Sequence, residues 1–376
     1  MHRRRFFSFA AGLAVLGCCG GCGGPDRPFT AMLTLIVPAA RGHGWDPLAR
    51  GMAAVAGAEG LARAAGVENR PGGPAGAALE ALASHGAPYG SPSGTPYGSR
   101  SGAPSGPSSR ERSVRDPLSR EPFSRDGRLL LAGMPAVAGA EIADTAAVVD
   151  STTPLARLAG DWAALIVLPG SRLRSFEDLA ALLRRDPGGL VMGGRLEGGS
   201  DHVLYGMIAK CLGADARLLQ YAGYPTAADA VEALRDGRVG AILGSARSFT
   251  REIAAGRLRP LVVSSAERLP GIDAPTLMEM DVRLEYTDWC GVFGPRGMSP
   301  DDRDRAVALC DALDASPRWR SLCEAGGWSR IYLSGDDFRQ WLSGETGRAR
   351  DVLRDLGLLK AFATTCWGSC VRSHYM

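Results

Sequence analysis

Short apolar runs alternate with longer amphipathic stretches along most of the chain. The run at residues 32–37 is apolar and partly β-branched, which favours a strand buried in a parallel sheet. A glycine-rich turn follows it, and then the first turns of a helix, which Asp46 can cap and whose first position suits Pro47. A helix that begins where a parallel strand ends is a ready site for an anion.

Beyond residue 160 the same alternation continues and predicts an α/β fold with parallel sheets. The predicted strands are residues 163–168, 190–193, 217–219, 239–243, 258–264 and 289–294. The predicted helices are residues 175–185, 200–212, 226–236, 248–255, 300–315, 317–326 and 334–356. The first of these helices carries Ser175 and Asp178 at the spacing of a capping box.

Residues 86–125 interrupt the pattern with a low-complexity stretch rich in Gly, Pro and Ser. This stretch lacks apolar periodicity and cannot bury enough surface to offset the entropy of ordering it. We therefore expect a disordered insertion that lengthens a surface loop of the first lobe. The chain is expected to re-enter the fold at the Asp126-Gly127 turn, which leads into a strand at residues 128–132.

The N-terminus has the pattern of an export signal. Three arginines at residues 3–5 precede an apolar core at residues 6–16, which is too short to span a bilayer. The Val-Leu-Gly before Cys18 resembles a lipobox and predicts lipidation of Cys18; the arginines with the following Phe-Phe also resemble a twin-arginine signal. Cleavage of an ordinary secretory signal near Cys22 is the alternative. The expected location is the periplasm or the outer face of the bacterial cell membrane, by the Sec or the twin-arginine route.

Composition is that of a globular protein. The 376 residues are 45% hydrophobic and 22% charged, which is enough for two compact lobes. The net charge of +3 is too weak to indicate nucleic-acid binding. Of the nine cysteines, Cys310 and Cys323 lie on successive predicted helices; they could form a disulfide in an exported protein or remain buried free thiols.

Catalytic and metal-binding motifs are missing from the sequence. The five histidines include no pair at metal-ligand spacing, and there is no Gly-x-Ser-x-Gly elbow or Walker loop. The segment at residues 42–47 mimics the start of a dinucleotide fingerprint, but Pro47 occupies the place of its third glycine. We therefore expect no catalysis, no cofactor and no metal, with a nucleotide-dependent α/β enzyme as the less favoured alternative.

The order of the glycine loops resembles one known family, the solute receptors of tripartite tricarboxylate transporters (Bug-type binding proteins). Their opening signature is Pro-Phe-x-x-Gly-Gly-x-x-Asp-x-x-x-Arg, and the matching residues here are Pro38, Gly42, Gly44, Asp46 and Arg50. Ala39 and His43 depart from it. Residues 193–202 resemble the second glycine loop of the family, and Tyr221-Ala222-Gly223 resembles its Tyr-x-Gly turn. The resemblance covers residues 33–360 apart from the insertion, and the tail at 361–376 is unmatched.

The resemblance implies a two-lobed, periplasmic-binding-protein-like (type II) α/β fold with a ligand cleft between the lobes. The lobe limits expected from it are 29–133 and 251–360 for the first lobe and 134–250 for the second, after a signal segment and tether at 1–28. It also implies capture of a small carboxylated metabolite, largely through backbone N–H groups and waters, for membrane permease subunits. A ligand-sensing subunit of a membrane signalling protein is the alternative.

Carried over by position, the ligand-binding residues are Gly42, His43, Trp45, Asp46, Gly198, Gly199, Ser200, Tyr221 and Gly223. The two strand–glycine–helix loops, at residues 40–46 and 198–202, agree with this set because helix N-termini suit a dicarboxylate. Asp46 can instead act only as a helix cap, and Tyr221 as a core residue. His43 and Trp45 are larger than the residues usual at these places and are expected to narrow the cleft or stack on a ligand.

Overall fold

The computed structural model describes residues 28–72, 76–83, 123, 125–145 and 148–359. In these residues ten strands form a continuous, curled array in the order β2-β1-β3-β9-β4-β7-β5-β6, with β10 and β8 also paired to β4, and β4 divides this array into two sheets. The strands are β1 (Thr30–Val37), β2 (Ala62–Asn69), β3 (Asp126–Gly133), β4 (Thr152–Val167), β5 (Val191–Arg195), β6 (Gln220–Tyr224), β7 (Ala241–Ser245), β8 (Arg259–Val263), β9 (Thr287–Pro295) and β10 (Ser329–Ser334).

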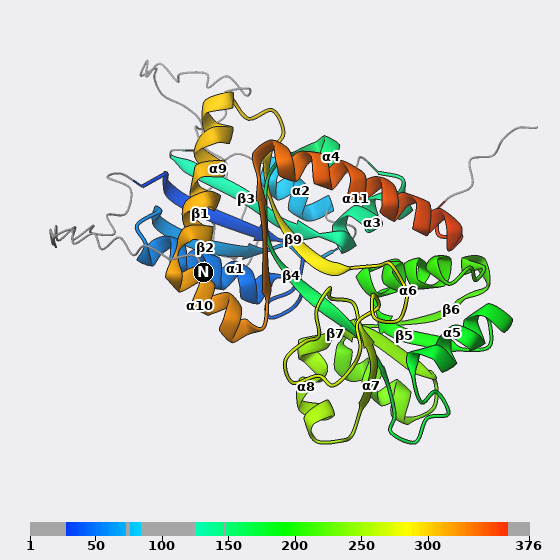
Figure 1. The fold of residues 1–376 in the computed structure, drawn as a ribbon. Coiled ribbons are helices and arrows are strands. Elements are labelled where there is room, and N and C mark those ends of the chain that lie inside the picture. The colour runs from blue at the N-terminus through cyan, green and yellow to red at the C-terminus, as the bar shows by residue number, and fades with distance from the viewer. Residues whose placement is uncertain (1–27, 73–75, 84–122, 124, 146–147, 360–376) are drawn as a thin grey trace, which may run out of the picture.

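Eleven α-helices of the described residues pack on this sheet (Figure 1). They are α1 (Asp46–Ala58), α2 (Gly76–Ala83), α3 (Met134–Ala143), α4 (Val148–Ser151), α5 (Phe176–Arg185), α6 (Ser200–Cys211), α7 (Ala227–Arg235), α8 (Ala246–Ala254), α9 (Pro300–Ala315), α10 (Pro317–Gly326) and α11 (Gly335–Asp355). None of the helices that the structure describes has the length and apolar character needed to cross a membrane.

The long strand β4 joins two lobes. Its residues 152–162 pair antiparallel with β9 in a first sheet, which β1, β2, β3 and β10 complete. Its residues 163–167 pair with β7 and β8 in a second sheet, which β5 and β6 complete. The last five residues of β4 are buried aliphatic side chains, as expected for a strand covered on both faces. The fold is therefore a two-lobed α/β fold, as predicted.

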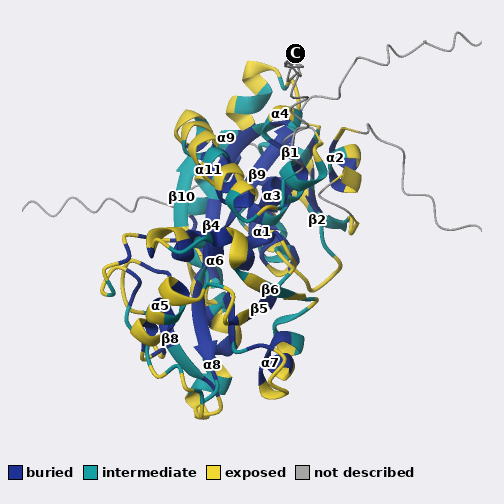
Figure 2. Ribbon diagram, turned by 90° about the vertical axis from the view of Figure 1, so that its right-hand side faces the viewer, coloured by how far each residue is buried: buried dark blue, intermediate teal, exposed yellow. Residues whose placement is uncertain are grey.

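Both lobes have apolar cores beneath their helices, and Figure 2 shows the central strands as the most buried part of the molecule. In the first lobe, α1, α9 and α10 bury Leu48, Cys310 and Trp319 on one face of the sheet. In the second lobe, α7 and α8 bury Leu234 and Phe249.

Helix α11 connects the two lobes. Its last turns bury Val352 and Leu353 in a core cluster that also contains side chains of α6, and the red end of α11 lies beside α6 in Figure 1. Lys210 at the end of α6 forms an ion pair of 2.7 Å with Asp355. The lobes are thus linked by β4, by the segment between β8 and β9, and by this helix contact.

Most of the predicted elements form, but three predictions need correction. The sheets are mixed rather than parallel, since β9 runs antiparallel to both β3 and β4. The predicted strand at 217–219 is a 3₁₀ turn (Ala216–Leu218), because the Asp215 carboxylate accepts a hydrogen bond from the Arg217 N–H at 3.1 Å; the strand follows at β6. The predicted strand at 163–168 is only the second part of β4.

The sheets divide the chain differently from the predicted second lobe at 134–250. Helix α3 follows β3 of the first sheet, and the first part of β4 pairs within that sheet, whereas β8 pairs within the second. We therefore propose that the second lobe starts at residue 163 and ends before β9. A strand shared by two sheets leaves no break in the sequence pattern, so the pattern alone does not mark this boundary.

Several predictions concern residues outside those described: lipidation of Cys18, most of the insertion, and the tail at 361–376. Phe123, at the end of the predicted insertion, is described and contradicts its expected lack of core contacts. Its ring is buried in the first lobe, and its N–H donates to the Asp302 carboxylate at 3.0 Å. Cys310 and Cys323 are buried free thiols, so the disulfide considered for them is not formed.

Candidate functional site

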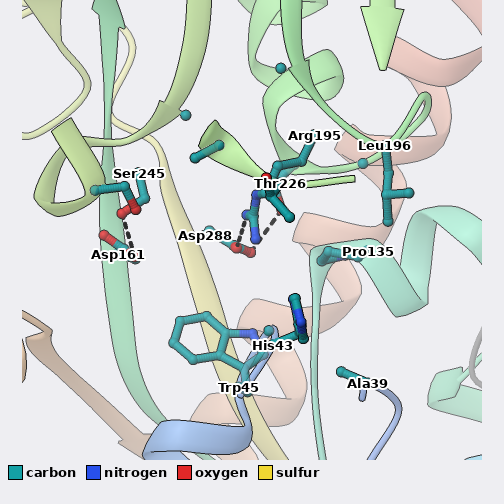
Figure 3. A pocket seen from close by; sticks show the side chains of 18 of the residues that line it. Ala39, His43, Trp45, Pro135, Asp161, Arg195, Leu196, Thr226, Ser245 and Asp288 are labelled. Atoms are coloured by element: carbon teal, nitrogen blue, oxygen red, sulfur yellow. Dashed lines mark hydrogen bonds and ion pairs between the residues drawn. The ribbon is translucent and has the colours of Figure 1, made fainter. Parts of the chain in front are cut away.

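A cleft of about 610 Å³ lies between the lobes. Its first wall comes from the loops after β1 and β3 and includes Gly42, His43, Gly44, Trp45, Gly133 and Pro135. Its second wall comes from the loops after β5, β6 and β7 of the second lobe, and we include in it Asp161 of β4 and Asp288 of β9, which lie at the end of the first sheet where the two lobes join. Figure 3 shows side chains of the two walls pointing toward one another across this space.

Five helices begin at the cleft. Lining residues lie in the first turn of each, namely Pro47 of α1, Pro135 of α3, Ser200 of α6, Ala227 of α7 and Ser248 of α8. Each helix follows a strand directly or through a short loop, so the helix N-termini gather where the strands end. The partial positive charge of these termini makes the cleft favourable for an anion without requiring a basic side chain.

The first glycine loop is held by Asp46, which is 1% exposed and does not line the cleft. Its carboxylate accepts hydrogen bonds from the Gly42 N–H (2.8 Å), the Asn69 amide (2.8 Å) and the Arg50 guanidinium (3.0 Å). Burial opposes ionisation of this group, but these donors outweigh it and lower the pKa of Asp46. Asp46 is therefore neither a helix cap nor a lining residue; the residue at the cap position is Trp45.

The second glycine loop is held in a similar way. The Gly198 N–H donates to His202 Nδ1 at 3.1 Å, and the His202 ring stacks on Tyr221 with centroids 4.0 Å apart. Burial lowers the pKa of His202 to about 4, so its imidazole is neutral and able to accept. The Tyr221 hydroxyl donates to the Arg195 carbonyl at 2.6 Å. A Cβ on Gly223 would lie 2.8 Å from the Glu197 N, so glycine permits close approach of the loop.

These contacts divide the residues predicted to bind ligand into two groups. Residues that line the cleft are Gly42, His43, Trp45, Gly199 and Ser200. Asp46, Gly198, Tyr221 and Gly223 lie behind the cleft, where they shape its two loops.

The backbone donors also differ from those expected. The N–H groups of Gly42, His43, Gly198 and Gly199 already donate within the chain. Among the N–H groups with no acceptor in the described residues are those of Gly44, Trp45, Ser200, Asp201 and His202. These free donors lie at or just before the starts of α1 and α6, whereas the N–H groups of Gly42, Gly198 and Gly199 are already engaged.

Two ion-paired clusters on the second wall were not predicted. In one, the Asp288 carboxylate accepts from the Ser200 hydroxyl (2.7 Å) and from Arg195 (3.2 Å). In the other, Asp161 Oδ2 accepts from the Ser245 hydroxyl (2.8 Å) and from Arg247 Nε (2.7 Å). The sequence does carry a signal for Asp161, since it is the one charged residue in the apolar stretch 158–168.

Ionisation is opposed by burial in the cluster around Asp288. Burial raises the pKa of Asp288 to about 6 despite the neighbouring Arg195. Burial also raises the pKa of Asp201, which lies behind the second loop and accepts from the Arg195 N–H at 2.9 Å. In the other direction, Asp201 raises the pKa of Arg195, which therefore stays charged.

The arrangement is suited to holding a small charged molecule. Helix N-termini and free N–H groups offer donors, and the paired side chains offer both signs of charge. Within the described parts of the chain, no group of three or more His, Cys, Asp or Glu side chains could hold a metal ion.

Comparison with known proteins finds relatives both in sequence and in structure. A protein of Pseudomonas sp. (strain P51), described as a UPF0065 protein, is 30% identical over 164 residues, which is 43% of this chain and 48% of that protein. The chain thus spans about half the length of this relative. Among solved structures, a TctC solute-binding protein from Polaromonas aligns with a TM-score of 0.63 and 20% identity over 88% of this chain and 99% of its own.

Two further structures share the fold and contain ligands. MatC from Rhodopseudomonas palustris with bound malate has a TM-score of 0.59 and 18% identity over 88% of this chain and 99% of its own. A second R. palustris protein, with adipate, has a TM-score of 0.61 and 20% identity over 89% and 98%.

The family model of the tripartite tricarboxylate transporter receptors matches residues 145–358, which include the second wall, β9 and α11. This match confirms the resemblance inferred from the glycine loops. The chain belongs to the tripartite tricarboxylate transporter receptor (TctC) family of solute-binding proteins.

Proposed function

We propose that this protein captures a small carboxylated metabolite in the cleft and delivers it, chemically unchanged, to the permease subunits of a tripartite tricarboxylate-type transporter. The observation that carries the proposal is the convergence of five helix N-termini on one cleft between two lobes. Such termini favour carboxylates. The malate and adipate in the two R. palustris structures support the same class of ligand.

Within the cleft, we assign ligand contact to the free N–H groups of Gly44, Trp45 and Ser200 and to the side chains of His43 and Trp45. Gly199 allows the ligand to approach the start of α6. Asp46, Gly198, Tyr221 and Gly223 act indirectly, by fixing the two loops. This assignment follows from which residues line the cleft and which N–H groups have no acceptor among the described residues.

The binding proposal is tested by thermal unfolding of the purified protein with di- and tricarboxylates, amino acids, aromatic acids and NAD. A ligand that binds only the folded state raises the free energy of unfolding by mass action, by about 2.7 kcal/mol at a hundredfold excess over Kd, and therefore raises the melting temperature. We expect at least one acid to raise it and to be recovered unchanged. Stabilisation by NAD and by no carboxylate would contradict the proposal and favour the nucleotide-dependent enzyme.

Gly199→Leu and Gly57→Leu form a matched pair for the same assay. A Cβ on Gly199 would lie 3.0 Å from the Leu196 carbonyl oxygen, and the added side chain would occupy the start of α6 at the cleft. Gly57 lies exposed on α1, and a Cβ there meets nothing within 4 Å. We expect the first variant to lose ligand stabilisation and the second to keep it.

Export and anchoring are a separate part of the proposal. We propose that the mature protein is held at the outer face of the cell membrane by a lipid on Cys18, which completes a lipobox in the sequence. Cys18→Ser should then release the protein from the membrane fraction. An unlipidated N-terminus in the wild-type mature protein would contradict this.

A further inference from the structure

We propose that the ligand carries a positively charged nitrogen in addition to its carboxylate, and that Asp161 and Asp288 receive this cationic group. The inference rests on the proposed function, because it assigns a ligand class to the same cleft. In this account the helix N-termini bind the carboxylate and the two aspartates bind the ammonium or a similar cation. The ligand class is therefore amino acids or related zwitterions rather than plain dicarboxylates.

The charge balance of the second wall, taken together with Asp201 behind its loop, favours a cationic group. Three carboxylates, those of Asp161, Asp201 and Asp288, face two guanidiniums, those of Arg195 and Arg247. When all are ionised, the group keeps one negative charge more than its arginines neutralise. A cationic group of the ligand would supply the missing positive charge.

The register of β4 and β9 brings two carboxylates together where the two lobes join. Asp161 of β4 and Asp288 of β9 are direct cross-strand partners in an antiparallel pair. Side chains at such positions lie on the same face of the sheet, and like charges directly opposite each other are destabilising. Both of these side chains line the cleft (Figure 3). A cationic group of a ligand bound in the cleft would reduce the repulsion between these two carboxylates.

One carboxylate oxygen of Asp161, Oδ1, receives no hydrogen bond from the described residues. The Asp161 side chain is only 9% exposed, and Ser245 and Arg247 both donate to Oδ2. The Oδ1 oxygen is not sealed from solvent, so it can accept a hydrogen bond from a ligand N–H in the cleft.

The arginines themselves are already engaged. Arg247 donates to Asp161, and its guanidinium also lies over the Trp328 ring at 5.0 Å from the centroid. Arg195 donates to Asp288 at 3.2 Å and lies 3.7 Å from Asp201. Two carboxylates would suffice to pair these two arginines, whereas there are three once Asp201, behind the second loop, is included.

The first wall supplies a matching aromatic surface. The Trp45 side chain lies across the cleft from Asp288 and Asp161 in Figure 3. A tryptophan face attracts a cation electrostatically, and carboxylates opposite an aromatic ring form a common environment for ammonium groups. Trp45 thus faces the aspartates at the position where the cation is expected.

The test is calorimetric titration of the mature protein at pH 7.5 with pairs of acids that differ only by one ammonium group. Suitable pairs are aspartate and succinate, glutamate and glutarate, and phenylalanine and 3-phenylpropionate. We expect the amino member of at least one pair to bind about tenfold more tightly than its partner. Asp288→Asn and Asp161→Asn should each reduce this ratio to about twofold or less.

Asp236→Asn is the matched control, since Asp236 is exposed at the opposite end of α7 and should leave the ratio unchanged. If plain acids bind as tightly as their amino partners, or if both aspartate variants keep the ratio, this inference is wrong while the proposed function stands. If no acid of either class binds, the proposed function fails and this inference fails with it.

Discussion

The two walls of the cleft differ in the chemistry they offer. Among the described residues that line the first wall, none is Asp, Glu, Lys or Arg; they are glycines, prolines, small apolar residues, His43 and Trp45. The second wall holds all four charged lining residues, which are Asp161, Arg195, Arg247 and Asp288. A cleft with one neutral, closely packed wall and one charged wall can select both the shape and the charge of its ligand.

The first prediction, with the largest effect, tests the close packing of the first wall. A Cβ on Gly133 would lie 2.1 Å from the Trp289 carbonyl oxygen and 3.0 Å from Trp45 Nε1, and the first of these is backbone. We expect Gly133→Ala to lower the free energy of unfolding by more than about 4 kcal/mol, measured by denaturant titration. Gly57→Ala, on an exposed face of α1, should instead be neutral or stabilising by about 0.5–1 kcal/mol.

The second prediction concerns the support of the first glycine loop. Asp46→Ala removes the acceptor of the Gly42 N–H, of Asn69 and of Arg50. Because charged, buried hydrogen bonds are lost, we expect a destabilisation of about 2–4 kcal/mol together with weaker ligand binding. The exposed Asp236→Ala should change stability by less than about 0.5 kcal/mol. Equal melting temperatures for the two variants would show that Asp46 does not hold the loop.

The third prediction uses pH to examine the second wall. Burial raises the pKa of Asp288 from its usual value to about 6, although Arg195 and Ser200 favour the charged form and Asp161 and Asp201 oppose it. Between the unfolded pKa near 3.8 and pH 6, the folded state binds more protons than the unfolded state, so this group's contribution to stability falls as pH rises. Above pH 6 the ionised group costs on the order of 2–3 kcal/mol.

Asp288→Asn removes this cost. The melting temperature of the variant relative to wild type should therefore be higher by a few degrees at pH 7.5 than at pH 4.5, in the absence of ligand. Using the difference between the two proteins cancels the titration of the other groups. A difference that is constant across this range would show that Asp288 does not titrate as described.

The smallest expected effect is at His43, which is exposed at the cleft. His43→Ala should change stability by less than about 0.5 kcal/mol. We expect it to weaken ligand binding only a few-fold, whereas Trp45→Leu should weaken it by about tenfold because the ring is lost as a surface for the ligand. Titration of both variants with the same acid distinguishes these contributions, and a larger loss for His43→Ala would reverse the assignment.

The sequence predicted the elements whose signals are local. Helices α9 and α10 have the predicted bounds, because each begins with a serine followed by proline. The strand–glycine–helix loop before α1 is also predictable from local sequence, because its glycines and Pro47 follow an apolar run. The wrong prediction of a strand at 217–219 also has a local cause, because the Asp215 side chain begins a 3₁₀ turn at Ala216–Leu218.

Features that depend on distant parts of the chain were not predicted. The role of Asp46 requires Asn69 of β2, and the pairing of Asp161 with Asp288 requires the register of two strands far apart in sequence. The same is true of the length of β4, whose two parts belong to different sheets. Four of the nine predicted ligand-contact residues lie behind the cleft, because the sequence does not reveal which side chains and N–H groups are already engaged within the loops.

In the function proposed above, the two walls of the cleft together hold one small acid without altering it. Native mass spectrometry of the protein purified from its own host, followed by identification of the released molecule, tests this most directly. We predict a single bound molecule per chain that contains a carboxylate and a basic nitrogen and is released intact. A nucleotide, or an acid recovered in chemically altered form, would contradict the account.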